Sequence, residues 1–410
     1  MIKRSLLRTL PKTVWALGAV SLLTDTASDM IYPLLPELLR QLGGGAVALG
    51  VMEGAAELLA SFVKVWSGHA SDRRGRRGPY VVFGYGLAAL ARPLMALVQA
   101  PWQVVVARAA DRVGKGIRSA PRDALIGAAV PPERRGLAFG LHRAMDNFGA
   151  VLGPIAAWSL LSFGGLSLRG VFAVALVPGL VATLLAWRAV RGELPATTRP
   201  EPRSGPASVE SGARTPLSPA ARRLLLVTGL FALGASADSF LMARLDDLRL
   251  PLAWIPIAWV TLQLAKALLN IPGGALADRL GARRVLIASW AIYALAYALF
   301  ARAGSWWTFW AVFPLYAIHY GLGEGAEKSL MARSCRPHER GAAFGAQHAV
   351  HGVAMLPANV LFGVLYAKRP DLAFWASGAL AALAAIALLV LIADDPNAPA
   401  AVTGEPVRLT

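Results

Sequence analysis

Long apolar segments dominate this chain and leave it few possible folds. Twelve stretches of membrane-spanning length stand between polar breaks, six on each side of a polar segment from Arg191 to Arg223. A bilayer core about 30 Å thick is crossed by about 20 helical residues, whereas barrel strands are about 10 residues long and alternate in polarity. Hydrophobic residues form 56% of the chain, which places most of its surface in lipid. The sequence therefore predicts an all-α integral membrane protein with twelve transmembrane helices.

The polar segment divides the predicted spans into two bundles. It is rich in Pro, Ser, Thr, Ala and Gly, a composition typical of a linker without a core. We expect an N-terminal six-helix bundle over residues 1–190, a cytoplasmic linker over 191–221, a C-terminal six-helix bundle over 222–393 and a tail over 394–410. The predicted spans are 13–39, 47–68, 80–100, 102–126, 137–163, 168–190, 222–245, 252–275, 284–302, 306–332, 341–367 and 371–393.

Two polar loop motifs occur once in each half of the chain. Asp-Arg-Arg-Gly-Arg-Arg begins at Asp72, and Asp-Arg-Leu-Gly-Ala-Arg-Arg begins 206 residues later at Asp278. A second motif begins at Arg135 and is repeated 205 residues later at Arg340. Such an offset indicates a duplicated unit of about half the chain, as found in carriers whose two bundles rock around a central site. A transporter is therefore the first functional hypothesis.

The distribution of basic residues predicts the orientation of the spans. The net charge of +17 would suggest nucleic acid as the partner of a soluble protein, but here the arginines collect in alternate short loops. Cationic loops stay on the cytoplasmic side of a membrane. We expect a multi-pass protein of the cytoplasmic (inner) membrane with both termini cytoplasmic, and no nucleic-acid partner. The loop arginines are Arg73, Arg74, Arg76, Arg77, Arg134, Arg135, Arg279, Arg283, Arg284, Arg333, Arg336 and Arg340.

The repeated loop motif resembles the signature between helices 2 and 3 of the major facilitator superfamily, and its copy resembles the second-half signature. The resemblance implies two pseudo-symmetric six-helix bundles and a gating role for both loops. It also implies that Asp72 meets the helix start near Gly341, and that Asp278 meets the one near Gly136, since free N–H groups and the helix dipole favour a carboxylate there. The gating residues so implied are Asp72, Arg73, Gly75, Arg76, Asp278, Arg279, Gly281 and Arg283.

Two further elements resemble this superfamily and point to its antiporter branch. Arg112 precedes Gly116 as in the helix 4 signature, and Gly149, Gly153 and Pro154 resemble the helix 5 element associated with drug:proton antiporters. The match stops there, because Ala157-Trp158 replaces the small pair that would follow. The resemblance implies proton-coupled export, with a small-molecule substrate and protons as partners.

Ionisable residues form stripes on the predicted helices of the N-terminal half. At 100° per residue, seven charged side chains of span 102–126, from Arg108 to Asp123, share one face. Buried charges are costly in a membrane, so they either pair in a structural network or serve a proton relay and a charged substrate pocket. Both interpretations stay open. The candidate cavity residues are Asp25, Asp29, Glu53, Glu57, Arg108, Arg112, Lys115 and Asp146.

The C-terminal half contributes fewer polar groups to the expected cavity. Gln263, Lys266 and Asn270 share a face by their spacing of three and four residues, and Glu324 and His348 lie on neighbouring spans. His348 and His351 are three residues apart without a nearby carboxylate motif, so no metal site is predicted. Trp259 or Phe313 is a candidate for stacking on a substrate.

The combined expectation is a secondary active transporter that exports a small organic molecule by alternating access, in exchange for protons. The arginines and lysine of span 102–126 hint at an anionic group, so an organic anion or siderophore-like metabolite fits as well as a drug. One alternative is a proton symporter that imports an organic anion. Another is an intramembrane enzyme, which we do not favour because no catalytic motif is found. No cofactor is expected, the lipid bilayer is the surrounding partner, and we expect a monomer.

Overall fold

The computed structural model describes residues 10–131, 134–191, 217–336 and 339–392. All regular secondary structure in these ranges is helical. Most of the predicted linker and the predicted tail, at 192–216 and 393–410, lie outside the described residues. The all-α prediction is confirmed.

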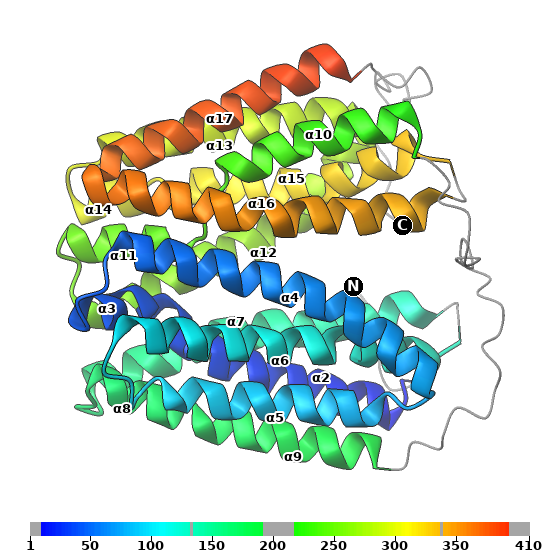
Figure 1. Cartoon of the computed structure of the whole chain (residues 1–410), viewed down its shortest axis with the longest axis vertical. Helices are drawn as coiled ribbons and strands as arrows, with labels where there is room; N and C mark the ends of the chain where they lie inside the picture. The colour runs from blue at the N-terminus through cyan, green and yellow to red at the C-terminus, as the bar shows by residue number, and fades with distance from the viewer. Residues whose placement is uncertain (1–9, 132–133, 192–216, 337–338, 393–410) are drawn as a thin grey trace, which may run out of the picture. The chain divides into compact units, whose positions relative to one another are not determined.

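The N-terminal helices follow the predicted spans closely (Figure 1). Pro33 and Pro36 interrupt the first span, because proline cannot donate the backbone hydrogen bond that would continue a helix. The helices are α2 (Lys12–Ile31), the short η1 (Tyr32–Leu34), α3 (Leu35–Gln41), α4 (Ala46–Arg74), α5 (Gly78–Leu94), α6 (Pro101–Ala128), α7 (Arg135–Ser162), α8 (Leu168–Val174) and α9 (Leu176–Val190).

The C-terminal helices follow their predictions equally well. The seventh span is broken at residues 235–238, where the side-chain Oδ1 of Asn359 accepts a hydrogen bond from the backbone N–H of Ala237 at 2.8 Å. The helices are α10 (Pro219–Gly234), α11 (Ser239–Asp247), η3 (Leu252–Trp254), α12 (Ile255–Leu280), α13 (Ala282–Arg302), α14 (Trp306–Trp310), α15 (Phe313–Ser334), α16 (Arg340–Lys368) and α17 (Pro370–Leu391).

Among the described residues, seven helical segments are long and apolar enough to cross a membrane by composition alone. The other predicted spans coincide with helices that are shorter or richer in polar residues. The charged residues of α6 and α7 make these two long helices too polar to be counted among the seven apolar segments. Their polar faces must be covered by protein or face water, since lipid cannot solvate them.

The described residues pack as two compact units. Unit 1 comprises residues 1–199, 237–263 and 355–368, and unit 2 comprises 200–236, 264–354 and 369–410. The helices α12 and α16 therefore each contribute one end to each unit. Residues 237–263 and 355–368 belong to the predicted C-terminal bundle by sequence. In the structure they pack with the first six spans, in unit 1.

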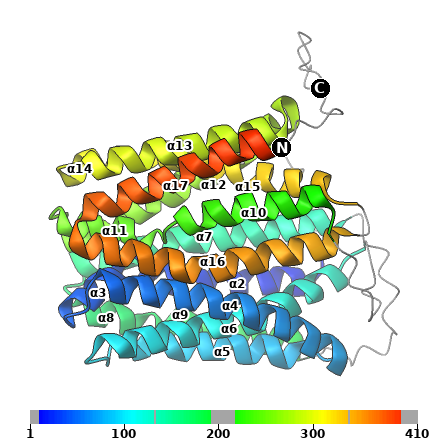
Figure 2. The ribbon, with the colours of Figure 1, turned by 45° about the horizontal axis from the view of Figure 1, so that its top comes forward.

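Glycines let the helices of unit 1 approach closely. A Cβ atom added at Gly149 or Gly153 of α7 would strike the carbonyl oxygen of Leu22 or Thr26 in α2. Helices α4 and α16 run side by side (Figure 2). Gly50 of α4 lies in the same way against the backbone of Asn359 in α16. Small residues at helix interfaces are the usual means of close packing in membranes. The helix 5 element thus has a packing role, because it places α7 directly on α2.

Unit 2 is held together by an aromatic core. Phe231 of α10 stacks on Trp290 of α13 with ring centroids 4.6 Å apart, and Tyr293 stacks on Tyr297 at 4.1 Å. The buried Ser289 hydroxyl hydrogen-bonds to Nδ1 of His319 in α15 at 2.9 Å. The core therefore joins α10, α13 and α15 within this unit.

Replacing Gly153 by Ala should destabilise the protein, because the new methyl group meets α2 backbone that cannot rotate away. Overpacking of this kind costs about 1 to 3 kcal/mol. Thermal unfolding of the purified protein in detergent measures the effect. Gly140→Ala is the matched control, since Gly140 lies on the same helix with open space around it. The control should keep or raise the melting temperature, and an equal response of both variants would contradict the packing role of Gly153.

Candidate functional site

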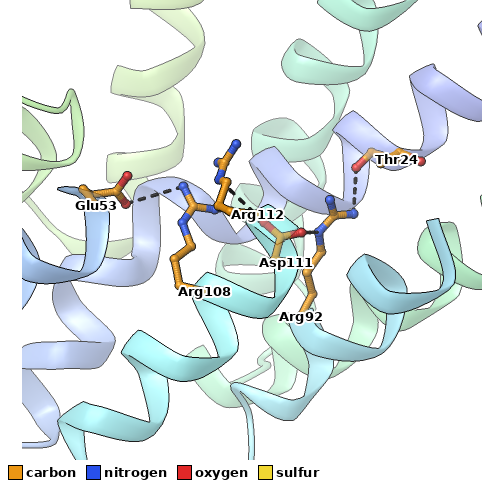
Figure 3. Close-up of polar contacts among 6 residues, drawn as sticks. All are labelled: Thr24, Glu53, Arg92, Arg108, Asp111 and Arg112. Atoms are coloured by element: carbon orange, nitrogen blue, oxygen red, sulfur yellow. Dashed lines mark hydrogen bonds and ion pairs between the residues drawn. The ribbon is translucent and has the colours of Figure 1, made fainter. Parts of the chain in front are cut away.

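A single carboxylate stands at the centre of the ionisable residues of unit 1. Asp111 of α6 is buried and faces three guanidinium groups (Figure 3). Its Oδ1 accepts a hydrogen bond from Nε of Arg92 at 2.9 Å. Its Oδ2 lies 3.4 Å from Nη1 of Arg108 and 3.8 Å from Nε of Arg112. The face predicted from the spacing of α6 is therefore organised around its acidic member.

Arg92 connects α5 to this centre. Its side chain is 2% exposed, and its Nη1 donates to the backbone carbonyl of Thr24 in α2 at 3.0 Å (Figure 3). Burying a guanidinium is costly unless it is paired and hydrogen-bonded, and Arg92 has both kinds of partner. One cation thus ties α5, α6 and α2 together.

Arg108 extends the network towards α4. Its Nη2 lies 3.5 Å from Oε1 of Glu53, which is also buried. Its guanidinium carbon lies 4.8 Å from the ring centroid of Tyr32, within the range of a cation–π interaction. The predicted pairing of an acidic stripe on the second span with the basic stripe of α6 is therefore present at Glu53.

Three carboxylates line the contact between α2 and α7. Asp146 of α7 accepts a hydrogen bond from the Ser21 hydroxyl and lies 3.8 Å from Nδ1 of the buried His142. Asp29 of α2 accepts a hydrogen bond from the indole N–H of Trp259 at 2.9 Å. Asp25 lies within electrostatic range of both Asp146 and Asp29. The close glycine packing of α7 on α2 brings this acidic group together.

Glu57 and Lys115 are the exposed members of the network. Glu57 lies on α4 and Lys115 on α6, within electrostatic range of each other. Arg112 is also within range of Glu57 and has a side chain that is 14% exposed. Charged side chains in membrane spans face water or protein rather than lipid. Glu57 and Lys115 therefore have the most exposed side chains among these charged residues.

The predicted residues of the C-terminal half have different surroundings. Gln263 is half-buried and belongs to unit 1, whereas the other four belong to unit 2. The Lys266 ammonium lies 3.7 Å from the ring centroid of Tyr320. Glu324 is exposed and pairs with Lys328 at 2.8 Å, and His348 is exposed. The side chain of Asn270 lies outside the described ones.

The repeated loops share a backbone feature that explains their glycines. Gly75 ends α4 with φ +62°, and Gly281 precedes α13 with φ +91°. This left-handed region is open to glycine at little cost. Asp72 lies 3.1 Å from Nη2 of Arg77 in its own loop, while Nη2 of Arg283 donates to the carbonyl of Leu389 at 2.6 Å.

The gating role of these loops remains a prediction. Each expected contact joins a residue of one compact unit to a helix start of the other. The side chains of Arg73, Arg76, Asp278 and Arg279 are exposed, which is consistent with a surface position for both motifs.

Sequence reasoning missed two residues of the central network. Asp111 was placed on the charged face without a role, and Arg92 was not singled out. The signal for Arg92 was present, because it is a lone cation in the otherwise apolar helix α5. A charge in such a helix requires a partner. Trp259, a candidate for substrate stacking, donates a hydrogen bond to Asp29, and its stacking role stays a prediction.

The sequence is similar to that of membrane transporters. It is 29% identical over 390 residues to an uncharacterised MFS-type transporter of Methanocaldococcus jannaschii, with 94% of this chain and 96% of that protein covered. It is 32% identical to the multidrug resistance protein MdtH of Yersinia enterocolitica over only 133 residues, which cover 32% of this chain and 33% of that protein.

Solved transporter structures share the fold. A bacterial homologue of the human lysosomal transporter Spinster, in an inward-facing and occupied conformation, superposes with a TM-score of 0.74 at 15% identity. The match covers 92% of this chain and 95% of that one. At this identity the likeness concerns the fold alone.

A family model provides the assignment. The model of the Major Facilitator Superfamily matches residues 17–262 and 245–409, which together span nearly the whole sequence. Members of this family are membrane transporters rather than enzymes, so the intramembrane enzyme alternative is set aside. With its all-helical fold, its duplicated loops and this match, the chain belongs to the major facilitator superfamily.

Proposed function

We propose that this transporter exports small organic cations, or amphipathic molecules that carry a positive charge, in exchange for protons. The observation that carries the proposal is that the guanidinium groups of the central network already have partners in the protein. Asp111 holds Arg92 and Arg108, and Glu53 holds Arg108 from the other side. The basic face of α6, which suggested an anionic substrate from sequence, is thus largely neutralised by the protein itself.

Three carboxylates of the network, Asp25, Asp29 and Asp146, lie close together where α2 meets α7. An uncompensated charge is expensive in a low-dielectric interior. A proton or a substrate cation can each supply a positive charge to this group. This shared role gives the competition on which exchange depends.

The sign of the electrostatic coupling favours exchange over symport for a cation. A proton on one of the carboxylates removes the negative charge that would attract a cationic substrate, so the two ligands exclude each other. For an anionic substrate the sign is reversed, because the same proton would favour anion binding. Reciprocal linkage then makes the anion and the proton bind together. Partial likeness to a multidrug resistance protein also supports export.

The second candidate is a proton symporter that imports an organic anion. The exposed ammonium of Lys115 favours it, because this cation has no ion pair among the described residues and lies beside Arg112. Both candidates use the same network and differ in which exposed group meets the substrate. For the first candidate this group is Glu57, and for the second it is Lys115.

Transport in membrane vesicles tests the direction and the coupling. Inside-out vesicles with an acidic lumen should accumulate ethidium when they contain the protein, and nigericin should stop this uptake by collapsing the pH gradient. Vesicles without the protein provide the baseline. Accumulation of p-aminohippurate by right-side-out vesicles under external acid, with no ethidium uptake in the first assay, would refute export and establish the symport candidate.

Two charge-removing variants separate the substrate classes. Ethidium should raise the melting temperature of the purified protein, since a ligand at 100 times its Kd stabilises by about 2.7 kcal/mol. Glu57→Gln should abolish most of that shift, whereas Lys115→Gln should keep it. Both side chains are exposed, so neither change creates a cavity. The reverse pattern, with a shift caused by p-aminohippurate and lost in Lys115→Gln, would contradict the cation assignment.

A further inference from the structure

The hydrogen bond between Trp259 and Asp29 joins two distant parts of the sequence. Trp259 belongs to α12 and Asp29 to α2, and both lie in unit 1. The indole Nε1 donates to the Asp29 carboxylate at 2.9 Å, and the Trp259 side chain is 4% exposed. Leaving a buried N–H donor without an acceptor destabilises the protein. This hydrogen bond therefore favours one arrangement of α12 on α2.

A second contact connects Trp259 to the central network. Its ring centroid lies 4.9 Å from that of Tyr32, and the Tyr32 ring in turn lies 4.8 Å from the guanidinium carbon of Arg108. Trp259 therefore meets the charged residues of the first spans at two points. One is the carboxylate of Asp29, and the other is the aromatic ring of Tyr32.

The same region of unit 1 is tightly closed. We call it the α3 end, defined by α3, α11, η3 and the last turns of α16. Here Gly50 and Gly363 leave no room for a Cβ between α4 and α16. Nε of Arg40 lies 2.9 Å from Oδ2 of Asp246, and the Tyr366 hydroxyl donates to Asp247 at 2.6 Å. The distribution of basic loops predicts that this end faces away from the cytoplasm.

We propose that the Trp259–Asp29 hydrogen bond is a proton-sensitive latch that holds the α3 end closed while Asp29 is ionised. An ionised carboxylate accepts a hydrogen bond about twice as strongly as a neutral group. Protonation of Asp29 weakens the bond without removing the Tyr32 contact. The α3 end then opens more often, because one of the contacts that hold α12 on α2 has lost its charge.

The surroundings of Asp29 are consistent with a titrating group. On its own helix it lies near Asp25, and from α6 and α5 it is faced by Lys115, Arg112 and Arg92. On α7 the nearby acidic group is Asp146, which interacts with Asp25. These groups surround the Asp29 carboxylate with charges of both signs. The latch thus depends on the charge of the whole cluster, which a bound substrate cation also changes.

This latch would prevent an exchanger from reorienting without a bound ligand. With Asp29 ionised and no ligand bound, the α3 end stays shut and the carrier does not reorient. Protonation of Asp29 weakens the latch and allows opening. The inference uses the assignment as a transporter and is compatible with either substrate class, so it stands apart from the direction of transport proposed above.

Cysteine accessibility tests the latch without any substrate. In a Cys335→Ser background, Ser239→Cys places a thiol at a fully buried position of α11, at the α3 end. A membrane-impermeant maleimide then reports opening. Leu97→Cys, at a position 72% exposed in the loop between α5 and α6, corrects for the intrinsic pH dependence of the thiol. The corrected labelling rate should be about tenfold higher at pH 5.5 than at pH 8.

Two latch variants and a control give the decisive comparison. Trp259→Phe keeps an aromatic ring beside Tyr32 and loses the N–H donor, so its labelling at pH 8 should match the fast acid rate and show no pH dependence. Asp29→Asn should behave likewise, because its amide cannot ionise. Trp254→Phe, whose native ring lies 6.3 Å from that of Trp158 in a tilted arrangement, should retain the native pH dependence.

Three outcomes would overturn the latch. They are native rates in Trp259→Phe at both pH values, retained pH dependence in Asp29→Asn, and loss of pH dependence in the Trp254→Phe control. The melting temperatures of all variants show whether each is folded. If Trp259→Phe does not fold, the labelling of Asp29→Asn alone tests the latch. Failure of ethidium export together with the predicted labelling pattern would retire the proposed substrate and leave the latch in place.

Discussion

The organisation of unit 1 depends on the carboxylate of Asp111. Three guanidinium groups from α5 and α6 converge on it, and two of them, Arg92 and Arg108, are fully buried. A shared carboxylate is effective because its two oxygens offer about four acceptor positions. Removal of one partner from such a group leaves buried charge behind, at a cost of about 3 to 5 kcal/mol. The network therefore fixes α5 and α6 to each other and, through Thr24, to α2.

This fixed centre determines which charges remain available for transport. Asp111 and Glu53 pair directly with Arg92 and Arg108, whereas the acidic residues of α2 lie within electrostatic range of Lys115 and the α6 arginines. The glycines of α7 then have a chemical consequence beyond packing. A side chain at Gly149 or Gly153 would push α7 away from α2 and separate Asp146 from Ser21 and Asp25. Close helix contact and the acidic cluster are thus two aspects of one interface.

The sequence predicted the helices far better than the partners of their side chains. Span length and polar breaks are local properties, so even the proline-interrupted first span and the two glycine-marked loops could be located. The face of α6 was also correct, because helical periodicity fixes it. Periodicity does not reveal which residue on another helix meets that face. Arg92, whose partner is 19 residues away, and Trp259, whose partner is 230 residues away, needed the packed structure.

The division of the chain into compact units bears on how such a transporter moves. The unit boundaries at 236/237, 263/264 and 354/355 fall in or between helices of the C-terminal half, and the first coincides with the break between α10 and α11. The Asn359 amide satisfies the backbone at that break, since its oxygen accepts from Ala237 and its nitrogen donates to the Met355 carbonyl at 2.8 Å. A helix interrupted there can change direction without leaving a buried N–H unpaired. Segments 237–263 and 355–368 therefore form a hydrogen-bonded group that packs with the first six spans, and the Trp259–Asp29 hydrogen bond joins the group to those spans.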